Sequence, residues 1–393
     1  MKPTLSRRQL LKWSGAAGTM AVAGPLVGCA PQPIPGAEGS DANSLVLRPG
    51  FTSRVIGVSG AAVAGTAHEY SLFPDGGATF ADPTVPGGWF YVANHEIPFG
   101  AGGVTSFRFA PDGRIVDAYP ICAGTSMNCA GGKTPWGTWL TCEEYDGGIV
   151  WECDPARPYS AVPRPQLGTF AHEAAAVASD GRVYLTEDRP DGGLYRFSPT
   201  AANDLSAGLL EIACSGPGDG TVLWKPVPDR FAQATPCRRQ VAGSLRFDGG
   251  EGIDTANGLV WFTTKGDDRI WQYDVTSGAL SIRYQAGASM LGGVDNITAT
   301  AVAGGQALLV SEDGDDMQIV AILPDDTLVE VVRIVGHPGS EVTGPALSPD
   351  RTRLYFSSQR APVPTPLGPG TPTVVAGMTY EVTGPFVSLL GMA

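Results

Sequence analysis

Polar clusters recur along this sequence, each one closing a short apolar run, and five of the six contain acidic residues. Carboxylates that converge in a small space repel one another, and a bound cation relieves that repulsion. Oxygen ligands favour Ca²⁺, whereas an added thiolate or imidazole admits iron or zinc. If the fold brings the clusters together, they predict a metal site. The runs are 89–96 (WFYVANHE), 138–144 (TWLTCEE), 182–188 (RVYLTED), 259–268 (LVWFTTKGDD), 307–313 (ALLVSED) and 353–359 (RLYFSSQ).

The spacing of these runs predicts how they are positioned. Most successive runs end about 45 residues apart, and the one long interval contains an insertion at residues 201–242. A period of about 40–50 residues is typical of four-stranded propeller blades. Tight-turn sequences such as 179–181 (SDG) and 348–350 (SPD) separate the apolar runs. We therefore predict an all-β protein, a six-bladed β-propeller whose strand ends meet at a central metal-binding channel.

Composition agrees with this fold class. The 393 residues include 53 Gly and 33 Pro, and only 17% are charged, so the chain is rich in turns and short elements. No long stretch shows the 3.6-residue period of an amphipathic helix beyond the N-terminal segment. The net charge of −13 argues against nucleic acid, because phosphate backbones attract Lys/Arg patches, and it suits a protein that collects cations.

The N-terminus has the features of an export signal. Residues 6–12 (SRRQLLK) match the twin-arginine (Tat) pattern, and the weakly apolar stretch 13–27 is too interrupted to span a membrane as a helix. Residues 26–29 (LVGC) suit lipoprotein processing at Cys29; a plain signal peptide with a chance cysteine is the alternative. We predict a signal peptide over 1–29, a Pro/Gly-rich tether over 30–44 and a propeller domain over 45–393. The protein would be a lipid-anchored membrane protein facing the periplasm or cell exterior.

Six cysteines remain after Cys29. Cysteines of exported proteins are often paired, although connectivity cannot be read from a sequence. Cys214 and Cys237 lie in the insertion and would close it as a loop. A disulfide between them is our first hypothesis.

One long motif resembles a known family. Residues 128–144 (NCAGGKTPWGTWLTCEE) are similar to the PhoX family of bacterial alkaline phosphatases. Shorter matches support the resemblance: 94–96 (NHE), 168–174 (GTFAHEA), 184–188 (YLTED), 251–253 (EGI) and 340–344 (SEVTG). The resemblance implies a six-bladed propeller with ferric iron (Fe³⁺) and calcium in its channel. It also implies hydrolysis of phosphate esters, in which metals bind the phosphate and activate the nucleophile.

Carried over to this sequence, the resemblance implies a set of site residues. Cys142 would be the thiolate ligand of iron, with a buried free thiol as the alternative. Asn94 or Asn128 would contact phosphate, and the sequence does not decide between them. His95 and His172 stand beside glutamates, where a structural role is the more common one. The implied carboxylate ligands of iron or calcium are Glu143, Glu173 and Glu251, with Glu187, Asp188, Glu312 and Asp313 as further candidates.

The sequence departs from the family at one position. An arginine normally stands two residues before the glutamate of the EGI motif, and here that residue is Gly249. An arginine fork is a natural clamp for phosphate oxygens. Other cations could replace it in space: Lys133, Arg189, Arg246 or Lys265.

Three functions follow. The first is an exported, metal-dependent phosphatase that acts as a monomer on small phosphate esters. The alternatives are a calcium-dependent hydrolase of another ester, and a non-enzymatic, metal-stabilised surface propeller that binds a partner.

Overall fold

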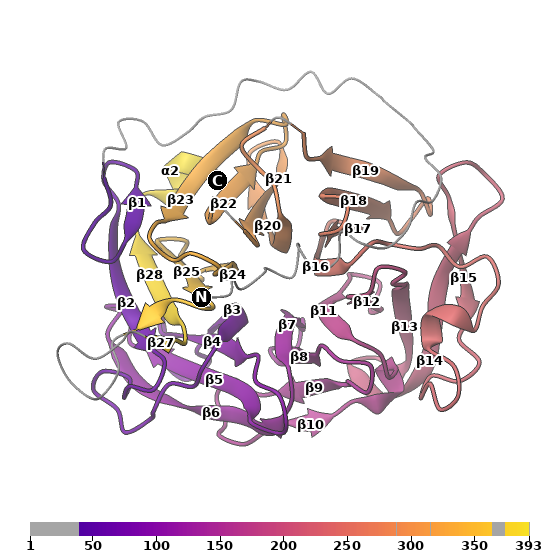
Figure 1. The fold of residues 1–393 in the computed structure, drawn as a ribbon, viewed down its shortest axis with the longest axis horizontal. Coiled ribbons are helices and arrows are strands. Elements are labelled where there is room, and N and C mark those ends of the chain that lie inside the picture. Colours follow the sequence, from indigo (N-terminus) through magenta and orange to yellow (C-terminus); the bar gives the residue numbers. More distant parts are fainter. Residues whose placement is uncertain (1–38, 288, 315, 364–373, 393) are drawn as a thin grey trace, which may run out of the picture.

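The described part of this computed structural model comprises residues 39–287, 289–314, 316–363 and 374–392. Within it, strands form six antiparallel sheets around a central channel (Figure 1). The predicted fold class, an all-β six-bladed propeller, is confirmed.

Each blade follows the chain outward from the channel. Blade one contains β3 (Pro74–Ala81), β4 (Trp89–His95), β5 (Gly102–Phe109) and β6 (Ile115–Thr125). Blade two contains β7 (Asn128–Lys133), β8 (Trp139–Glu143), β9 (Val150–Cys153) and β10 (Val162–Pro163). Blade three contains β11 (His172–Val177), β12 (Val183–Glu187), β13 (Leu194–Ala201), β14 (Asp204–Ser215) and β15 (Val222–Pro226).

The second half of the ring repeats this order. Blade four contains β16 (Gly250–Ala256), β17 (Leu259–Thr264), β18 (Arg269–Asp274) and β19 (Leu280–Gln285). Blade five contains β20 (Val294–Val302), β21 (Gly305–Glu312), β22 (Gln318–Ile322), β23 (Leu328–Ile334) and β1 (Leu45–Leu47). Blade six contains β24 (Val342–Leu347), β25 (Arg353–Ser358), β28 (Met378–Thr383) and β2 (Thr52–Val58). The remaining elements are β26 (Pro362–Val363), β27 (Val374–Val375), the 3₁₀ turns Pro165–Leu167 and Cys237–Arg239, and helix α2 (Phe386–Leu390).

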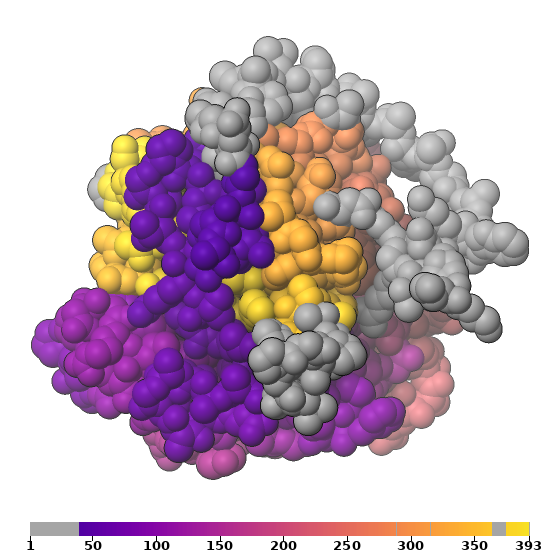
Figure 2. Space-filling model, turned by 60° about the vertical axis from the view of Figure 1, so that its left-hand side comes forward, coloured from indigo at the N-terminus to yellow at the C-terminus, as the bar shows by residue number. Residues whose placement is uncertain are grey.

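The two ends of the described chain close the ring together. The N-terminal strand β2 pairs antiparallel with the C-terminal strand β28, and β1 adds a fifth strand to blade five through β23. Figure 2 shows the indigo N-terminal segment lying against the yellow C-terminal one. This pairing fixes the sixth blade to the first, so the inner strands form a closed circle in which each contacts the next.

Apolar side chains between neighbouring blades hold the circle rigid. Tyr91 of blade one stacks on Tyr355 of blade six with ring centroids 4.8 Å apart, and within blade one Trp89 stacks on Phe109 at 5.1 Å. All four side chains are almost completely buried. Burial of one large apolar side chain stabilises a fold by about 1.5–3 kcal/mol, and repeated contacts of this kind keep the inner strands in register.

The insertion at 201–242 extends blade three. It contains β14, β15 and the turn Cys237–Arg239. The predicted disulfide between Cys214 and Cys237 is wrong, because both are free thiols in one apolar cluster. Cys214 Sγ contacts the Ile212 carbonyl at 3.8 Å, and Cys237 Sγ contacts the Arg230 carbonyl at 3.5 Å. Each thiol is therefore directed toward local backbone.

The predicted signal peptide and Cys29 lie outside the described residues, as does most of the tether. Strand β1 begins at Leu45. No helix within the described ranges is long and apolar enough to cross a membrane.

Candidate metal centre

All six inner strands carry an irregularity at the same point. The pairing of each inner strand with its neighbour shifts register by one residue: between Pro74 and Gly77 in β3, Asn128 and Gly131 in β7, His172 and Ala175 in β11, Gly250 and Ile253 in β16, Val294 and Ile297 in β20, and Thr343 and Ala346 in β24. Such a bulge redirects a side chain. The first residue within each shift forms what we call the bulge ring: Asp75, Cys129, Glu173, Glu251, Asp295 and Gly344.

A second ring follows the neighbouring strands. The residue directly after each second strand forms the strand-end ring: Glu96, Glu144, Asp188, Lys265, Asp313 and Gln359. Consecutive strand residues point to opposite faces. The residue that follows a strand therefore directs its side chain to the channel, whereas the last residue of the strand directs its side chain into its own blade.

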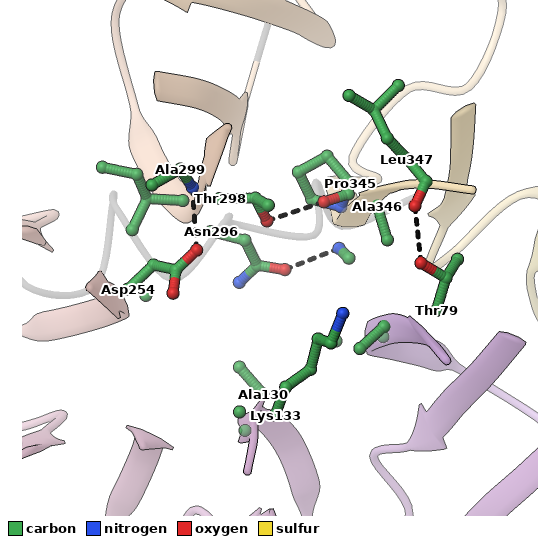
Figure 3. A pocket seen from close by; sticks show the side chains of 18 of the residues that line it. Thr79, Ala130, Lys133, Asp254, Asn296, Thr298, Ala299, Pro345, Ala346 and Leu347 are labelled. Atoms are coloured by element: carbon green, nitrogen blue, oxygen red, sulfur yellow. Dashed lines mark hydrogen bonds between the residues drawn. The ribbon is translucent and has the colours of Figure 1, made fainter. Parts of the chain in front are cut away.

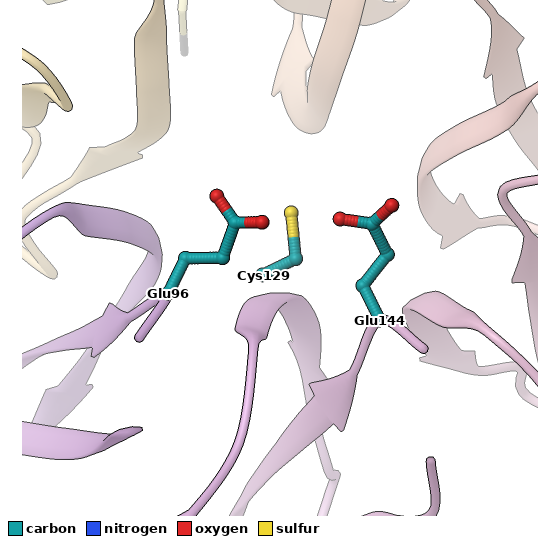
Figure 4. Close-up of side chains that lie close together, drawn as sticks. All are labelled: Glu96, Cys129 and Glu144. Atoms are coloured by element: carbon teal, nitrogen blue, oxygen red, sulfur yellow. The ribbon is translucent and has the colours of Figure 1, made fainter. Parts of the chain in front are cut away.

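The two rings meet in one continuous cluster. Four groups of side chains offer ligand atoms within 4.8 Å of one another. They are Glu96, Cys129 and Glu144; Asp75, Glu96 and Glu341; Glu144, Glu173 and Asp188; and Glu173, Glu251 and Asp295. Figure 4 shows the Cys129 thiol between two carboxylates from neighbouring blades. Because the groups share members, these eight carboxyl groups and one thiol form a single site, which we call the channel cluster.

The acidic side chains of the channel cluster are buried close together, and this raises their pKa values. Burial and the neighbouring carboxylates raise the pKa of Asp75, Glu173 and Asp295 well above their ordinary values. Burial with the nearby acids raises the pKa of Glu341 to about 7 and that of the Cys129 thiol well above its usual range. Carboxyl groups that hold protons at neutral pH for lack of positive charge become ligands when a cation displaces those protons.

Two side chains of the protein supply positive charge. Lys265 forms ion pairs with Asp188 at 2.5 Å and with Glu251. Arg360 lies 3.0 Å from Glu341 and 3.9 Å from Glu96. Two cations cannot neutralise eight carboxyl groups, so the cluster keeps capacity for metal ions.

The donor set fits the metals that the resemblance implies. Glu173 is fully buried, and within the described residues no hydrogen-bond partner reaches its Oε2 atom. A buried carboxylate oxygen is costly to leave without a partner, and a cation provides one. Carboxylates suit Ca²⁺, and the single thiolate suits a metal such as iron. The residues present therefore fit a centre of calcium and iron.

The structure brings several predicted ligands to this centre and places others elsewhere. Glu173, Glu251 and Asp188 lie in the channel cluster. Asp313 lies at its edge, where its backbone forms an isolated bridge with Glu341. Cys142 does not join them: its side chain is completely buried in an apolar cluster with Leu140 and Val150.

The other three predicted glutamates end their strands and tie down loops of their own blades. Glu143 accepts hydrogen bonds from the Ser126 and Ile149 amides at 2.8 and 3.3 Å. Glu312 accepts from the Gly292 and Gln318 amides at 2.9 and 3.1 Å. These carboxylates face away from the channel because they stand one residue before the strand-end ring.

Glu187 has the same position in blade three. It accepts hydrogen bonds from the Tyr195 hydroxyl at 2.7 Å and the Gly193 amide at 3.0 Å, and it forms an ion pair with Arg238 at 2.8 Å.

The two histidines beside glutamates also form hydrogen bonds within the protein. His95 contacts the Thr105 hydroxyl at 2.8 Å, and His172 contacts the Gly168 carbonyl at 3.0 Å. Burial lowers the pKa of both histidines to about 3, which keeps them neutral.

Neither predicted phosphate contact reaches the channel. Asn94 and Asn128 are completely buried. The Asn94 amide donates to the carbonyls of Cys129 and Ala130 at 3.0 and 2.8 Å, and Trp139 donates to its oxygen at 2.9 Å. Asn94 thereby fixes the bulge that presents the Cys129 thiol.

Asn128 is bonded within its surroundings. Its oxygen accepts from the Thr125 hydroxyl at 2.6 Å, and its amide donates to the Thr141 hydroxyl at 3.0 Å. Asn94 thus acts on the site through the backbone that it holds, whereas the side chain of Asn128 bonds to hydroxyl groups.

Sequence reasoning missed most of the channel cluster. The missed members are Asp75, Glu96, Cys129, Glu144, Asp295 and Glu341. One signal was available for two of them, because Glu96 and Glu144 each close a predicted run. The bulge ring had no comparable signal, since a register shift of one residue leaves little trace in composition.

The environment of Gly249 accounts for the missing arginine. A Cβ atom at Gly249 would lie 2.8 Å from Lys265 Cγ, so the lysine occupies the space that a side chain there would need. The other candidate cations are engaged elsewhere: Arg189 with Asp146 at 3.0 Å, and Arg246 with the Arg238 carbonyl.

Beyond the bulge ring the channel continues as a cavity of 430 Å³ (Figure 3). It begins at Gly76 and Ala130 and follows the inner strands. Lys133 points into it, and Asp254 lies on its wall, where burial raises the pKa of that carboxyl to about 6. The fourth candidate cation thus lines the cavity.

Fold and site together define a six-bladed β-propeller with a carboxylate- and thiol-lined channel. The family model described as alkaline phosphatase PhoX matches residues 97–149 and 145–287. A twin-arginine translocation signal model matches residues 4–24. These matches confirm the predicted resemblance to the PhoX family and the predicted Tat signal sequence.

One solved structure agrees on the fold. The structure of Pseudomonas fluorescens PhoX in complex with vanadate, described as a transition state analogue, is similar with a TM-score of 0.69 and 18% identity, covering 88% of this chain and 97% of that one. A luciferin-regenerating enzyme (TM-score 0.48, 14% identity, covering 85% of this chain and 96% of its own) and a gluconolactonase from Xanthomonas campestris (0.44, 11%, 86% and 99%) are more distant. No protein of curated function matches the sequence.

Proposed function

We propose that this protein is an exported, metal-dependent phosphoesterase of the alkaline phosphatase PhoX type, acting on small phosphate esters. The observation that carries the proposal is the channel cluster, in which four overlapping ligand groups include one thiol. Five of its nine members lie within the residues that the PhoX family model matches: Cys129, Glu144, Glu173, Asp188 and Glu251. A site that bound only structural calcium would have no need of that thiol. The proposed metals are calcium and iron.

The residues of the chain take distinct roles in this proposal. Cys129, in place of Cys142, is the thiolate ligand, and Asn94 holds its backbone in position. Glu173, Glu251 and the other carboxylates of the channel cluster hold the cations. The bound cations would stabilise the charge of the transferring phosphoryl group and lower the pKa of an oxygen nucleophile.

Lys265 weakens one objection to this activity, which is that Gly249 stands where the family has an arginine. An unfilled position would remove a cation from the site, but Lys265 crosses the space beside Gly249 and keeps a positive charge there. A lysine binds phosphate as a point charge and lacks the fork of an arginine. We therefore expect a weaker orientation of the ester than an arginine would give.

A matched pair of variants tests the proposal. Purified protein is supplied with Ca²⁺ and iron, its metals are measured by elemental analysis, and p-nitrophenyl phosphate is the substrate. Cys129→Ser should lose iron and at least about 100-fold in kcat. Replacing a residue that only supports a metal ligand typically costs about 10–100-fold in affinity or activity, and replacing the ligand itself should cost at least as much. Cys142→Ser should keep both, since its thiol packs in the apolar interior.

Two results would count against the proposal. Wild-type protein that binds calcium alone and hydrolyses no phosphomonoester would favour the non-enzymatic surface propeller. Turnover of a lactone in place of the phosphate ester would favour the calcium-dependent hydrolase of another ester.

We further propose that the mature protein is a monomer anchored by lipid at Cys29 and facing the periplasm or cell exterior. The support is the Tat signal at residues 4–24 and the LVGC sequence that ends the signal peptide. Wild-type protein expressed with its signal should partition into the detergent phase of a Triton X-114 extract. Cys29→Ser should partition into the aqueous phase, and equal partitioning of the two would refute the anchor.

A further inference from the structure

Lys265 is an exception in the strand-end ring. Four of the other five positions in that ring are carboxylates and the fifth is Gln359, so blade four alone places a cation there. Hydrogen bonds hold the strand end that carries it: β17 ends at Thr264, whose hydroxyl donates to Asp267 at 2.5 Å and accepts from the Trp271 indole at 3.1 Å. This strand end directs the ammonium group into the channel.

The ammonium group joins two of the four ligand groups. It pairs with Asp188, which belongs to the group of Glu144 and Glu173, and with Glu251, which belongs to the group of Glu173 and Asp295. These are the contacts that a metal ion between blades three and four would make. A divalent cation could not share both carboxylates with the ammonium, since like charges at such distances repel strongly.

The backbone beside Lys265 is shaped to receive it. Gly249 has φ +68°, a conformation that favours glycine, and its carbonyl accepts the Lys265 amide hydrogen bond at 2.9 Å. A Cβ at this position would approach Lys265 Cγ to 2.8 Å and Asp188 Oδ1 to 3.3 Å. The absence of a side chain at 249 and the presence of a lysine at 265 are therefore parts of one arrangement.

We propose that the ammonium group of Lys265 takes the place of one metal ion in the channel cluster, as a cation built into the chain. Blade four is then neutralised without a metal, and the bound cations are confined to the remaining ligand groups. This inference rests on the metal centre of the proposed function but not on its reaction.

Calcium stoichiometry tests the inference directly. Wild-type protein, Lys265→Met and Lys265→Arg are stripped with EDTA and dialysed against Ca²⁺ alone, and bound calcium is measured by elemental analysis and by titration calorimetry. Lys265→Met, which keeps the length of the side chain without its charge, should bind about one more Ca²⁺ per chain than the wild type. Lys265→Arg should bind the wild-type number.

A control and a second probe keep the outcomes separate. Lys225→Met removes a half-buried lysine outside the channel cluster, whose ammonium donates to the Ala242 carbonyl at 3.5 Å, and it should leave stoichiometry unchanged. An unchanged or lower calcium count in a folded Lys265→Met protein would overturn the inference. Weaker binding of inorganic phosphate with an unchanged count would assign the ammonium to substrate instead. Absence of phosphatase activity in wild-type protein supplied with both Ca²⁺ and iron would count against the proposed function and leave the stoichiometry result standing.

Discussion

Replacing Asn94 tests whether the fold positions the thiol of the channel cluster. The change Asn94→Leu preserves side-chain size and removes three hydrogen bonds, to the carbonyls of Cys129 and Ala130 and from the Trp139 indole. Asn94 is completely buried, so water cannot replace these bonds. At about 1–3 kcal/mol for each buried group that loses its partner, and with partial relaxation, we expect a loss of about 3–5 kcal/mol in the free energy of unfolding.

That magnitude leaves a folded protein to assay. Domains are typically stable by about 5–15 kcal/mol, and a chain of this size should lose about 1–2 °C of Tm per kcal/mol. We therefore expect a Tm lower by about 3–10 °C in differential scanning fluorimetry. Because the same bonds hold the Cys129 backbone, iron affinity should fall by about 10–100-fold, measured by competition with a chelator.

Asn128→Leu is the matched control. Asn128 is equally buried, but its two side-chain bonds go to the hydroxyls of Thr125 and Thr141 and not to the bulge. This variant should lose stability by a similar mechanism and keep its iron affinity. Equal loss of iron in the two variants, or normal iron binding by Asn94→Leu, would refute the positioning role of Asn94.

Three further outcomes are expected. Without metals, the free energy of unfolding should fall as pH rises from about 4.5 to 7. The pKa of Glu341 is raised to about 7, so over this range the folded state holds a proton that the unfolded chain releases. This group alone accounts for about 3 kcal/mol, and Ca²⁺ should abolish the trend in Tm. Glu187→Gln should destabilise by about 1.5–3 kcal/mol, since it removes one charge partner of Arg238 and leaves Asp191 at 2.9 Å as the other, yet it should keep full metal content by elemental analysis. Gly249→Ala should lower Tm and disturb calcium binding because it displaces Lys265, whereas unchanged binding would mean that the lysine finds room.

The blade repeat could be predicted because it follows from composition and spacing. Each run from 89–96 to 353–359 forms the second strand of a blade, and each ends where the structure ends that strand within a few residues. The acidic pairs were correctly placed at strand ends. What the runs could not show was which member of each pair faces the channel, since one residue of shift reverses the face.

Glu187 and Asp188 illustrate this limit. Both are acidic and adjacent, and the sequence ranks them equally. In the structure, Glu187 accepts a hydrogen bond from the Tyr195 hydroxyl and pairs with Arg238, whereas Asp188 lies in the channel cluster. The two cysteines of the long motif pose the same problem, because Cys142 lies within strand β8 while Cys129 lies in a bulge. A register shift depends on pairing between distant strands, and no local property of the chain records it.

The two basic side chains that pair with the channel cluster, Lys265 and Arg360, lie at blades four and six. In blade six the ring position is Gly344, with φ +62° and a Cβ site 2.7 Å from the Gly77 amide nitrogen, so no ligand side chain fits there. Arg360 pairs with Glu341 beside this gap, and Lys265 pairs with Glu251 in blade four. Among the described residues the Cys129 thiol hydrogen-bonds only to carboxylates, Asp75 and Glu173. Positive charge from the chain is thus supplied at two blades and withheld from the thiol. Metal ions should therefore gather on the side of blades one to three, with iron at the thiol.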